Sequence, residues 1–321
     1  MTILLPRNSP HDRFYRGGAR LTAMRGGDAS ATHEPEDWIG STTTVRGEAT
    51  DGLSVLPDGR LLRDAVEADP VGWLGAEHVA RWGADVRLLV KLLDAGQRLP
   101  VHAHPHDRFA AEHLGCAHGK AEAWYILEGG TVHIGLREDA DPAHLAELVR
   151  TQDTAALLAL LHQVEVSPGD VVWMPPGELH AIGEGVLLLE LQQPEDLSIL
   201  LEWEGFAIDG AVEGHLGLGF DLALTAVATG RREVAELLST APRSGSVLPA
   251  AADEYFVLER LPLSGPASID AGFSVITVVN GHAEIAGRPL TAGDVLLVPA
   301  EAGVLEADGD GEVLVARPPR P

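Results

Sequence analysis

The heptapeptide GDVVWMP at residues 169–175 recurs as GDVLLVP at residues 293–299. Ahead of each copy lie two short apolar runs around a glycine turn, YILEGGTVHIG at 125–135 and TVVNGHAEIA at 277–286. Gly-Asp-Val is a common tripeptide, so chance is the alternative explanation. The shared order of strand, turn, strand, Gly-Asp, strand and proline favours duplication instead. The sequence therefore predicts a mainly β protein with two related small β-barrels.

The two copies differ in length because the first contains a helical insertion. Residues 141–162 repeat leucine and alanine at helical spacing, which predicts two short helices in a small helical subdomain. A second helical segment is predicted over residues 61–83. We therefore expect an N-terminal barrel with both insertions in residues 1–215 and a C-terminal barrel in residues 216–321.

The composition excludes several classes of protein. The 321 residues include 23 lysines and arginines and 48 aspartates and glutamates, a net charge of −25 that would repel nucleic-acid phosphates. Cys116 is the single cysteine, so an intrachain disulfide framework and a cysteine-based zinc finger are excluded. There is neither a signal-peptide pattern nor an apolar run of about 18 residues that would predict a membrane span. We expect a soluble cytoplasmic protein that contacts neither nucleic acid nor membrane.

Four side chains have the pattern of a metal site. His102 and His104 lie two residues apart on a predicted strand, so both imidazoles point to one face. Glu122 and His180 belong to neighbouring predicted strands of the same barrel. Three nitrogens and one carboxylate oxygen suit a divalent transition metal ion, namely zinc, iron, manganese, nickel or cobalt. The alternative is that each histidine is an ordinary polar surface residue.

The C-terminal copy lacks these ligands. When the two Gly-Asp sequences are aligned, Val304 stands opposite His180, and alignment on the glycine turns puts Phe273 opposite Glu122. We therefore expect metal in the first barrel alone and a structural role for the second.

These residues resemble the two cupin motifs, G(X)5HXH(X)3–4E(X)6G and G(X)5PXG(X)2H(X)3N. The matching positions are Gly96, His102, His104, Glu122 and Gly129 in the first motif, and Gly169, Pro175, Gly177 and His180 in the second. The resemblance implies two cupin (jelly-roll) barrels. The sequence departs from the motifs in two places, because 17 residues separate His104 from Glu122 and because Glu184 stands where asparagine is usual.

The long spacer resembles that of the type I phosphomannose isomerases, which belong to the cupin superfamily. The similar segments are VKLLD (90–94), VHAHP (101–105), GKAEAWY (119–125), PPGELHA (175–181) and LLELQQ (188–193). The similarity runs from about residue 34 to the C-terminus and is strongest over 86–203. It implies a zinc-dependent isomerase that interconverts mannose 6-phosphate and fructose 6-phosphate.

Carried over by position, the resemblance assigns each candidate residue a role. It implies that His102, His104, Glu122 and His180 bind one zinc ion, although glutamine or lysine is usual at the first of these positions. The residues that match the family's pocket are Lys91, Lys120 and Glu190 as catalytic residues, and Glu36 and Asp196 as substrate-binding residues. Leu200 stands where the family has an arginine that is important for catalysis.

The chemistry of these side chains fits an aldose–ketose isomerisation. A proton moves between C1 and C2 of the open-chain sugar, which needs a base and a group that stabilises negative charge on the sugar oxygens. Glu190, Glu36 or Asp196 could act as the base, and Lys91 and Lys120 could neutralise the charge or bind an anionic substituent. Each lysine could also be an ordinary solvated surface amine.

Two functions remain open at this point. The first is a mannose-6-phosphate isomerase. The second is a metal cupin that binds or isomerises another sugar without a phosphate, or that senses a sugar without catalysis. A phosphorylated substrate would need a cation in place of the missing arginine, for which Arg87, Arg98 and Arg108 are the arginines near the motif. Nothing in the sequence predicts the oligomeric state.

Overall fold

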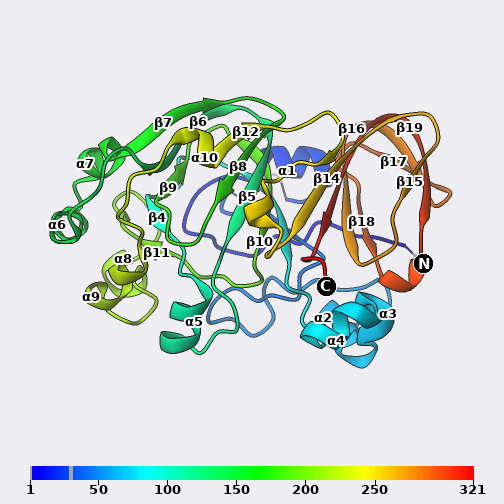
Figure 1. Ribbon diagram of the computed structural model, residues 1–321, viewed down its shortest axis with the longest axis horizontal. Coiled ribbons are helices and arrows are strands. Elements are labelled where there is room, and N and C mark those ends of the chain that lie inside the picture. The colour runs from blue at the N-terminus through cyan, green and yellow to red at the C-terminus, as the bar shows by residue number, and fades with distance from the viewer. Residues whose placement is uncertain (1, 29–31) are drawn as a thin grey trace.

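The computed structural model describes residues 2–28 and 32–321, which form a mainly β structure of three antiparallel sheets (Figure 1). In the hydrogen-bonding order of these residues none of the sheets closes on itself. No helix in the described part of the chain is long and apolar enough to cross a membrane.

A six-stranded sheet occupies the middle of the molecule (Figure 1). Its strands, in spatial order, are β12 (Leu238–Thr240), β8 (Asp170–Met174), β5 (Glu122–Glu128), β10 (Leu187–Gln192), β3 (Leu89–Asp94) and β2 (Glu36–Ile39).

A five-stranded sheet packs against one face of the six-stranded sheet. Its strands, in spatial order, are β11 (Ile199–Leu200), β4 (His102–Ala103), β9 (His180–Ile182), β6 (Gly130–Leu136) and β7 (Leu161–Val166). Side chains of both sheets share one buried cluster, in which Trp124 and Ile126 meet Ile134 and Ile182. The two sheets therefore form a sandwich with an apolar interior.

Alternation along the central strands decides which side chains enter this interior. Along β5, Ala123 and Tyr125 face the outer core, whereas Trp124 and Ile126 face the five-stranded sheet. Successive side chains point to opposite faces of a sheet, so Glu122 shares the inner face with Trp124. The same alternation puts Glu36 on β2, Lys91 on β3 and Glu190 on β10 on this inner face. The polar residues are all buried there.

An eight-stranded sheet covers the outer face of the six-stranded sheet. Its strands are β1 (Ile3–Leu4), β18 (Val295–Val298), β16 (Ser274–Ile285), β19 (Leu305–Arg317), β14 (Val257–Ser264) and β13 (Gly245–Ser246), with β15 (Ala267–Ile269) beside β19 and β17 (Arg288–Thr291) beside β16. Two strands cross the predicted boundary at residue 215. β1 pairs with β18 in this sheet, and β12 pairs with β8 in the six-stranded sheet.

The helices lie around the sheets. They are α1 (Ala19–Arg25), α2 (Leu62–Ala68), α3 (Pro70–Leu74), α4 (Ala76–Trp82), α5 (Asp107–His113), α6 (Pro142–Thr151), α7 (Thr154–Ala159), α8 (Gly210–Glu213), α9 (Phe220–Ala223) and α10 (Val234–Leu237). Short 3-10 helices span Leu224–Ala226, Ala250–Ala252 and Ala300–Ala302. Helices are thus present in both segments where the sequence predicts them, 61–83 and 141–162. Helices α6 and α7 of the segment 141–162 form one end of the molecule (Figure 1).

The repeated Gly-Asp sequences form the same turn. Gly169 has φ of 89° and Gly293 has φ of 94°, a left-handed conformation that favours glycine. In each turn the aspartate that follows accepts a 2.8 Å hydrogen bond from the backbone N–H three residues earlier, Ser167 to Asp170 and Thr291 to Asp294. The strand after each turn pairs with the strand of the preceding hairpin, β8 with β5 and β18 with β16. The two copies therefore share turn chemistry and strand pairing.

A buried polar contact between Tyr125 and Glu312 links the six-stranded and eight-stranded sheets. We predict that Tyr125→Phe, which removes it, destabilises the protein. The Tyr125 hydroxyl donates a 2.9 Å hydrogen bond to Glu312 Oε1, and Arg260 pairs with the other oxygen at 2.5 Å. Removing one hydrogen bond to a buried carboxylate should cost about 1–2 kcal/mol of unfolding free energy. Denaturant unfolding measures this loss. An unchanged transition midpoint would show that the contact contributes nothing to stability.

Candidate metal centre

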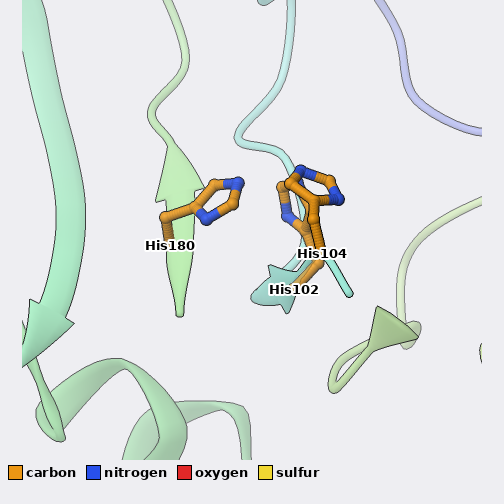
Figure 2. A group of neighbouring side chains, drawn as sticks. All are labelled: His102, His104 and His180. Atoms are coloured by element: carbon orange, nitrogen blue, oxygen red, sulfur yellow. The ribbon is translucent and has the colours of Figure 1, made fainter. Parts of the chain in front are cut away.

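Three buried histidines project from the five-stranded sheet and from the segment after β4 into the sandwich (Figure 2). His102 on β4 lies directly opposite His180 on β9, and His104 follows two residues after His102. Each Nδ1 lies within hydrogen-bond distance of a backbone carbonyl, His102 at 2.8 Å from Pro100, His104 at 2.7 Å from Leu197 and His180 at 2.9 Å from Glu178. A carbonyl only accepts, so each Nδ1 carries the proton. In the neutral form of each ring, Nε2 is therefore the nitrogen free to accept.

The imidazoles converge on the carboxylate of Glu122. The three histidines each offer a ring nitrogen within 4.8 Å of the others, a group that can hold a metal ion. Glu122 Oε2 lies 3.0 Å from His104 Nε2, and Oε1 lies 3.2 Å from His180 Nε2. His180 Nε2 and Glu122 Oε2 are buried and make no hydrogen bond. Lys120 supplies a cation to Glu122 Oε2 and His104 Nε2, at 3.0 and 3.1 Å, whereas His180 Nε2 is buried beside the carboxylate without a partner and still lacks a cation.

Burial disfavours the cationic form of two of the imidazoles. Burial, together with the charge of Lys120, lowers the pKa of His104 to about 3, and burial lowers the pKa of His102 well below its usual value. Neutral imidazoles and an ionised carboxylate are the forms that bind a divalent transition metal ion. The donor set therefore fits one such ion.

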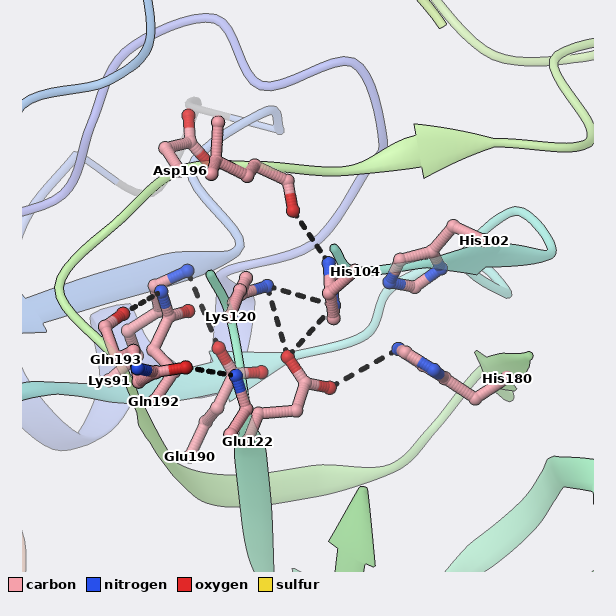
Figure 3. A network of polar contacts seen from close by, with 12 residues as sticks. Lys91, His102, His104, Lys120, Glu122, His180, Glu190, Gln192, Gln193 and Asp196 are labelled. Carbon is pink, nitrogen blue, oxygen red and sulfur yellow. Dashed lines mark hydrogen bonds and ion pairs between the residues drawn. The ribbon is translucent and has the colours of Figure 1, made fainter. Parts of the chain in front are cut away.

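Two buried lysines lie beside these groups (Figure 3). Lys120 Nζ is 3.0 Å from Glu122 Oε2 and 3.1 Å from His104 Nε2. Burial alone would lower the pKa of Lys120, but Glu122 and Glu190 raise it above its ordinary value. Lys91 Nζ lies 3.4 Å from Glu190 Oε1 and 3.5 Å from Glu36 Oε2. Neither lysine is a solvated surface amine.

The three candidate bases differ in their surroundings. Burial, followed by the charge of Glu122, raises the pKa of Glu190, whose Oε1 makes no hydrogen bond. Glu36 accepts hydrogen bonds from the Tyr15 hydroxyl and, at 2.5 Å, from Trp38 Nε1. Burial would raise the pKa of Glu36, but Arg13 and Lys91 lower it to about 2. Burial would raise the pKa of Asp196, but Arg13, Lys91 and the backbone N–H of Arg46 together lower it below its ordinary value.

The candidate metal, catalytic and substrate-binding side chains, except His104 and His180, line one narrow cavity with a volume of about 30 Å³. Its wall includes the predicted residues Glu36, Lys91, His102, Lys120, Glu122, Glu190 and Asp196. His104 and His180 contact Glu122 at its edge. The structure thus brings together the residues that the sequence singles out as metal ligands, catalytic residues and substrate-binding residues.

No family model matches the chain. Mannose-6-phosphate isomerase ManA of Bacillus subtilis (strain 168) is 30% identical to it over 248 residues, which cover 71% of this chain and 74% of that protein. The chain belongs to the mannose-6-phosphate isomerase family.

Solved structures of mannose-6-phosphate isomerases share the fold over nearly the whole length. The crystal structure of the enzyme from Bacillus subtilis has a TM-score of 0.77 at 22% identity, covering 98% of this chain and 99% of that chain. A mannose 6-phosphate isomerase bound with zinc and yttrium has a TM-score of 0.76 at 17% identity, covering 99% of this chain and 100% of that chain.

In this mannose-6-phosphate isomerase fold, the cation near Leu200 is not one of the three arginines that the sequence suggested. The three arginines proposed from the sequence do not line the cavity. Arg98 pairs with Glu202 at 2.5 Å, Arg108 with Glu112 at 2.8 Å, and Arg87 lies near Asp85 at 3.8 Å.

Arg13 lines the cavity together with Leu200 instead. Its guanidinium lies 3.4 Å from both carboxylate oxygens of Asp196. Sequence analysis missed Arg13 and Tyr15, because both lie in an irregular N-terminal segment without a motif or a periodic pattern. No signal in the single sequence could have placed them beside Glu36.

Proposed function

We propose that the protein interconverts mannose 6-phosphate and fructose 6-phosphate with one divalent metal ion held by His102, His104, Glu122 and His180. The observation that carries this proposal is the convergence of three buried imidazoles beside the buried Glu122 carboxylate, with His180 Nε2 left without any hydrogen-bond partner. The names of the relatives and the shared fold support the choice of reaction.

Zinc is the metal we propose. Three nitrogens and one carboxylate form a donor set that zinc accepts in catalytic sites. A mannose 6-phosphate isomerase of the same fold is described as bound with zinc, which supports the choice. A bound zinc ion would supply Lewis-acid polarisation of the sugar's carbonyl and hydroxyl oxygens.

The side chains of the cavity divide the remaining work. Glu190 acts as the base that takes the proton from C2 of the aldose and returns it to C1, because its pKa is raised and its Oε1 makes no hydrogen bond, with Lys91 Nζ 3.4 Å away. The proton of the C2 hydroxyl moves to O1 in the same isomerisation. Lys120 and Lys91 donate hydrogen bonds to the negative charge that develops on the sugar oxygens. Glu36 and Asp196 stay ionised and accept hydrogen bonds from sugar hydroxyls.

One observation favours the second candidate, a sugar without phosphate. Outside the cavity lies an open vestibule whose wall carries five carboxylates and only two guanidinium groups, a net charge of −3. An acidic entrance repels a phosphorylated substrate more than a neutral one. A phosphorylated substrate therefore needs the arginines of the vestibule to offset this negative charge, whereas a neutral sugar does not.

We also propose that the fold is an internal duplication of two cupin-type barrels, divided near residue 215. The identical Gly-Asp turns and the matching strand pairings support the duplication. Phe273 and Val304, which stand opposite Glu122 and His180, are apolar and support a metal-free C-terminal unit. The cytoplasmic location stays a prediction from the sequence.

The test of the proposed function is a pair of assays on the zinc-loaded protein. Mannose 6-phosphate is expected to be converted to the ketose with a kcat/KM at least about tenfold above that of free mannose, because a charged group contributes that much binding energy. Turnover of mannose alone would overturn the phosphorylated substrate in favour of the second candidate. No turnover of either sugar would overturn the isomerase.

A further inference from the structure

The cavity and the vestibule meet at a narrow junction. Five residues line both spaces, namely Arg13, Phe14, Asp196, Ser198 and Leu200. The proposed ligands His102 and Glu122 and the proposed base Glu190 line the inner cavity alone. A sugar whose C1 and C2 lie among these groups therefore extends its C6 end toward the junction.

Arg13 is the cation at this junction. Its side chain is only 11% exposed and lies between two carboxylates. Both Nη atoms lie 3.4 Å from Asp196, at the long end of hydrogen bonding, and Nε makes no hydrogen bond and lies 3.6 Å from Glu36 Oε1. The two acids hold the guanidinium plane in place without saturating its five N–H donors.

The charge around Arg13 depends on the metal. With the four carboxylates ionised, the inner cavity sets Arg13, Lys91 and Lys120 against Glu36, Glu122, Glu190 and Asp196, a net charge of −1. One divalent cation changes this to +1. The loaded cavity is then positive and attracts an anion, although the vestibule outside is acidic.

We propose that Arg13 binds the phosphate group of the substrate and so determines the preference for a phosphorylated sugar. This inference rests on the proposed function. A guanidinium presents two parallel N–H donors that match two phosphate oxygens, which a lysine cannot reproduce. The phosphate would replace the long contacts to Asp196. Leu200, which is buried at the same junction, supplies no charge there.

Arg46, the second cation of the vestibule, is not the primary phosphate ligand. Its side chain is exposed and its Nη2 donates to the Leu216 carbonyl at 3.2 Å, while its backbone N–H donates to Asp196 at 3.2 Å. Solvent screens an exposed charge, so its contribution to binding is smaller.

The test compares the binding of mannitol 6-phosphate and of mannitol, two polyols that cannot react, to the zinc-loaded protein by calorimetry. Arg13→Gln is expected to weaken the binding of mannitol 6-phosphate by about 10–100-fold and to leave the dissociation constant of mannitol within about twofold. Arg13→Lys should recover only part of the loss. Arg108→Gln, which changes an exposed arginine paired with Glu112, is the matched control and should alter neither constant.

Two results would overturn the inference. The first is an equal loss for both polyols, which would show that Arg13 merely supports the cavity. The second is an unchanged preference for the phosphorylated polyol. Because Arg13→Gln removes one cation from beside two buried carboxylates, the double variant Arg13→Gln/Asp196→Asn repeats the measurement with one of those charges removed. Zinc content checks that the site is intact. Failure of the proposed reaction would show separately, as an absence of turnover by a wild type that still prefers mannitol 6-phosphate.

Discussion

His180→Ala is expected to abolish zinc binding at a stoichiometric level and to lower kcat/KM by at least about 10³-fold. The Nε2 of this residue is buried, faces Glu122 and has no other partner, so its loss removes one of four donors from the site. Metal analysis after dialysis should show less than about one-tenth of an equivalent of zinc per chain. Circular dichroism and thermal unfolding establish that the variant is folded.

The control for this experiment is His144→Ala. His144 is exposed on α6, in the helical insertion, so the His144→Ala variant should keep wild-type zinc content and activity. Full zinc content in His180→Ala would contradict the proposed ligand set.

Glu190→Gln is expected to lower kcat by about 10²–10⁴-fold while zinc content stays at one equivalent. The amide has the size of the carboxylate but cannot accept the sugar's proton. Removal of a general base usually lowers the rate by this amount. Glu190 contacts Lys91 and lies on the inner face of β10, so the substitution keeps the packing of the strand. Steady-state kinetics with mannose 6-phosphate measure the loss, and KM should change much less than kcat.

Glu184→Gln provides a matched control, because Glu184 is an exposed glutamate in the turn between β9 and β10. A kcat of Glu190→Gln close to that of the control would assign the base to another carboxylate. Glu36→Gln and Asp196→Asn would then distinguish the two remaining candidates.

The metal-binding residues could be predicted from the sequence because their spacing reflects strand geometry. His102 and His104 are two residues apart. The turns at Gly169 and Gly177 set the directions of β8 and of β9, which carries His180. Lys91 and Glu190 follow from the resemblance to the family rather than from local rules. In the structure they lie opposite one another on the paired strands β3 and β10.

Arg13 and Tyr15 could not be predicted in the same way. Their segment has no regular structure, and its position depends on contacts between residues far apart in the sequence. Asn8 Nδ2, for example, donates 2.9 Å hydrogen bonds to the carbonyls of Trp38 and Gly52. Arg87, Arg98 and Arg108 lie near the motif along the chain, but none of them lines the cavity.

The pairing of β1 with β18 has a consequence for the order in which the protein is made. The backbone N–H of Leu5 donates to the Val295 carbonyl, and Arg25 donates to the carbonyls of Gly293 and Leu5. We therefore expect the N-terminal segment that carries Arg13 to reach its final position after residues 293–298 have been synthesised. Contacts between residues so distant along the chain carry a loop-closure cost that slows their formation. A chain truncated before β18 would lack the strand that pairs with β1, and with it the anchor of the N-terminal wall of the substrate cavity.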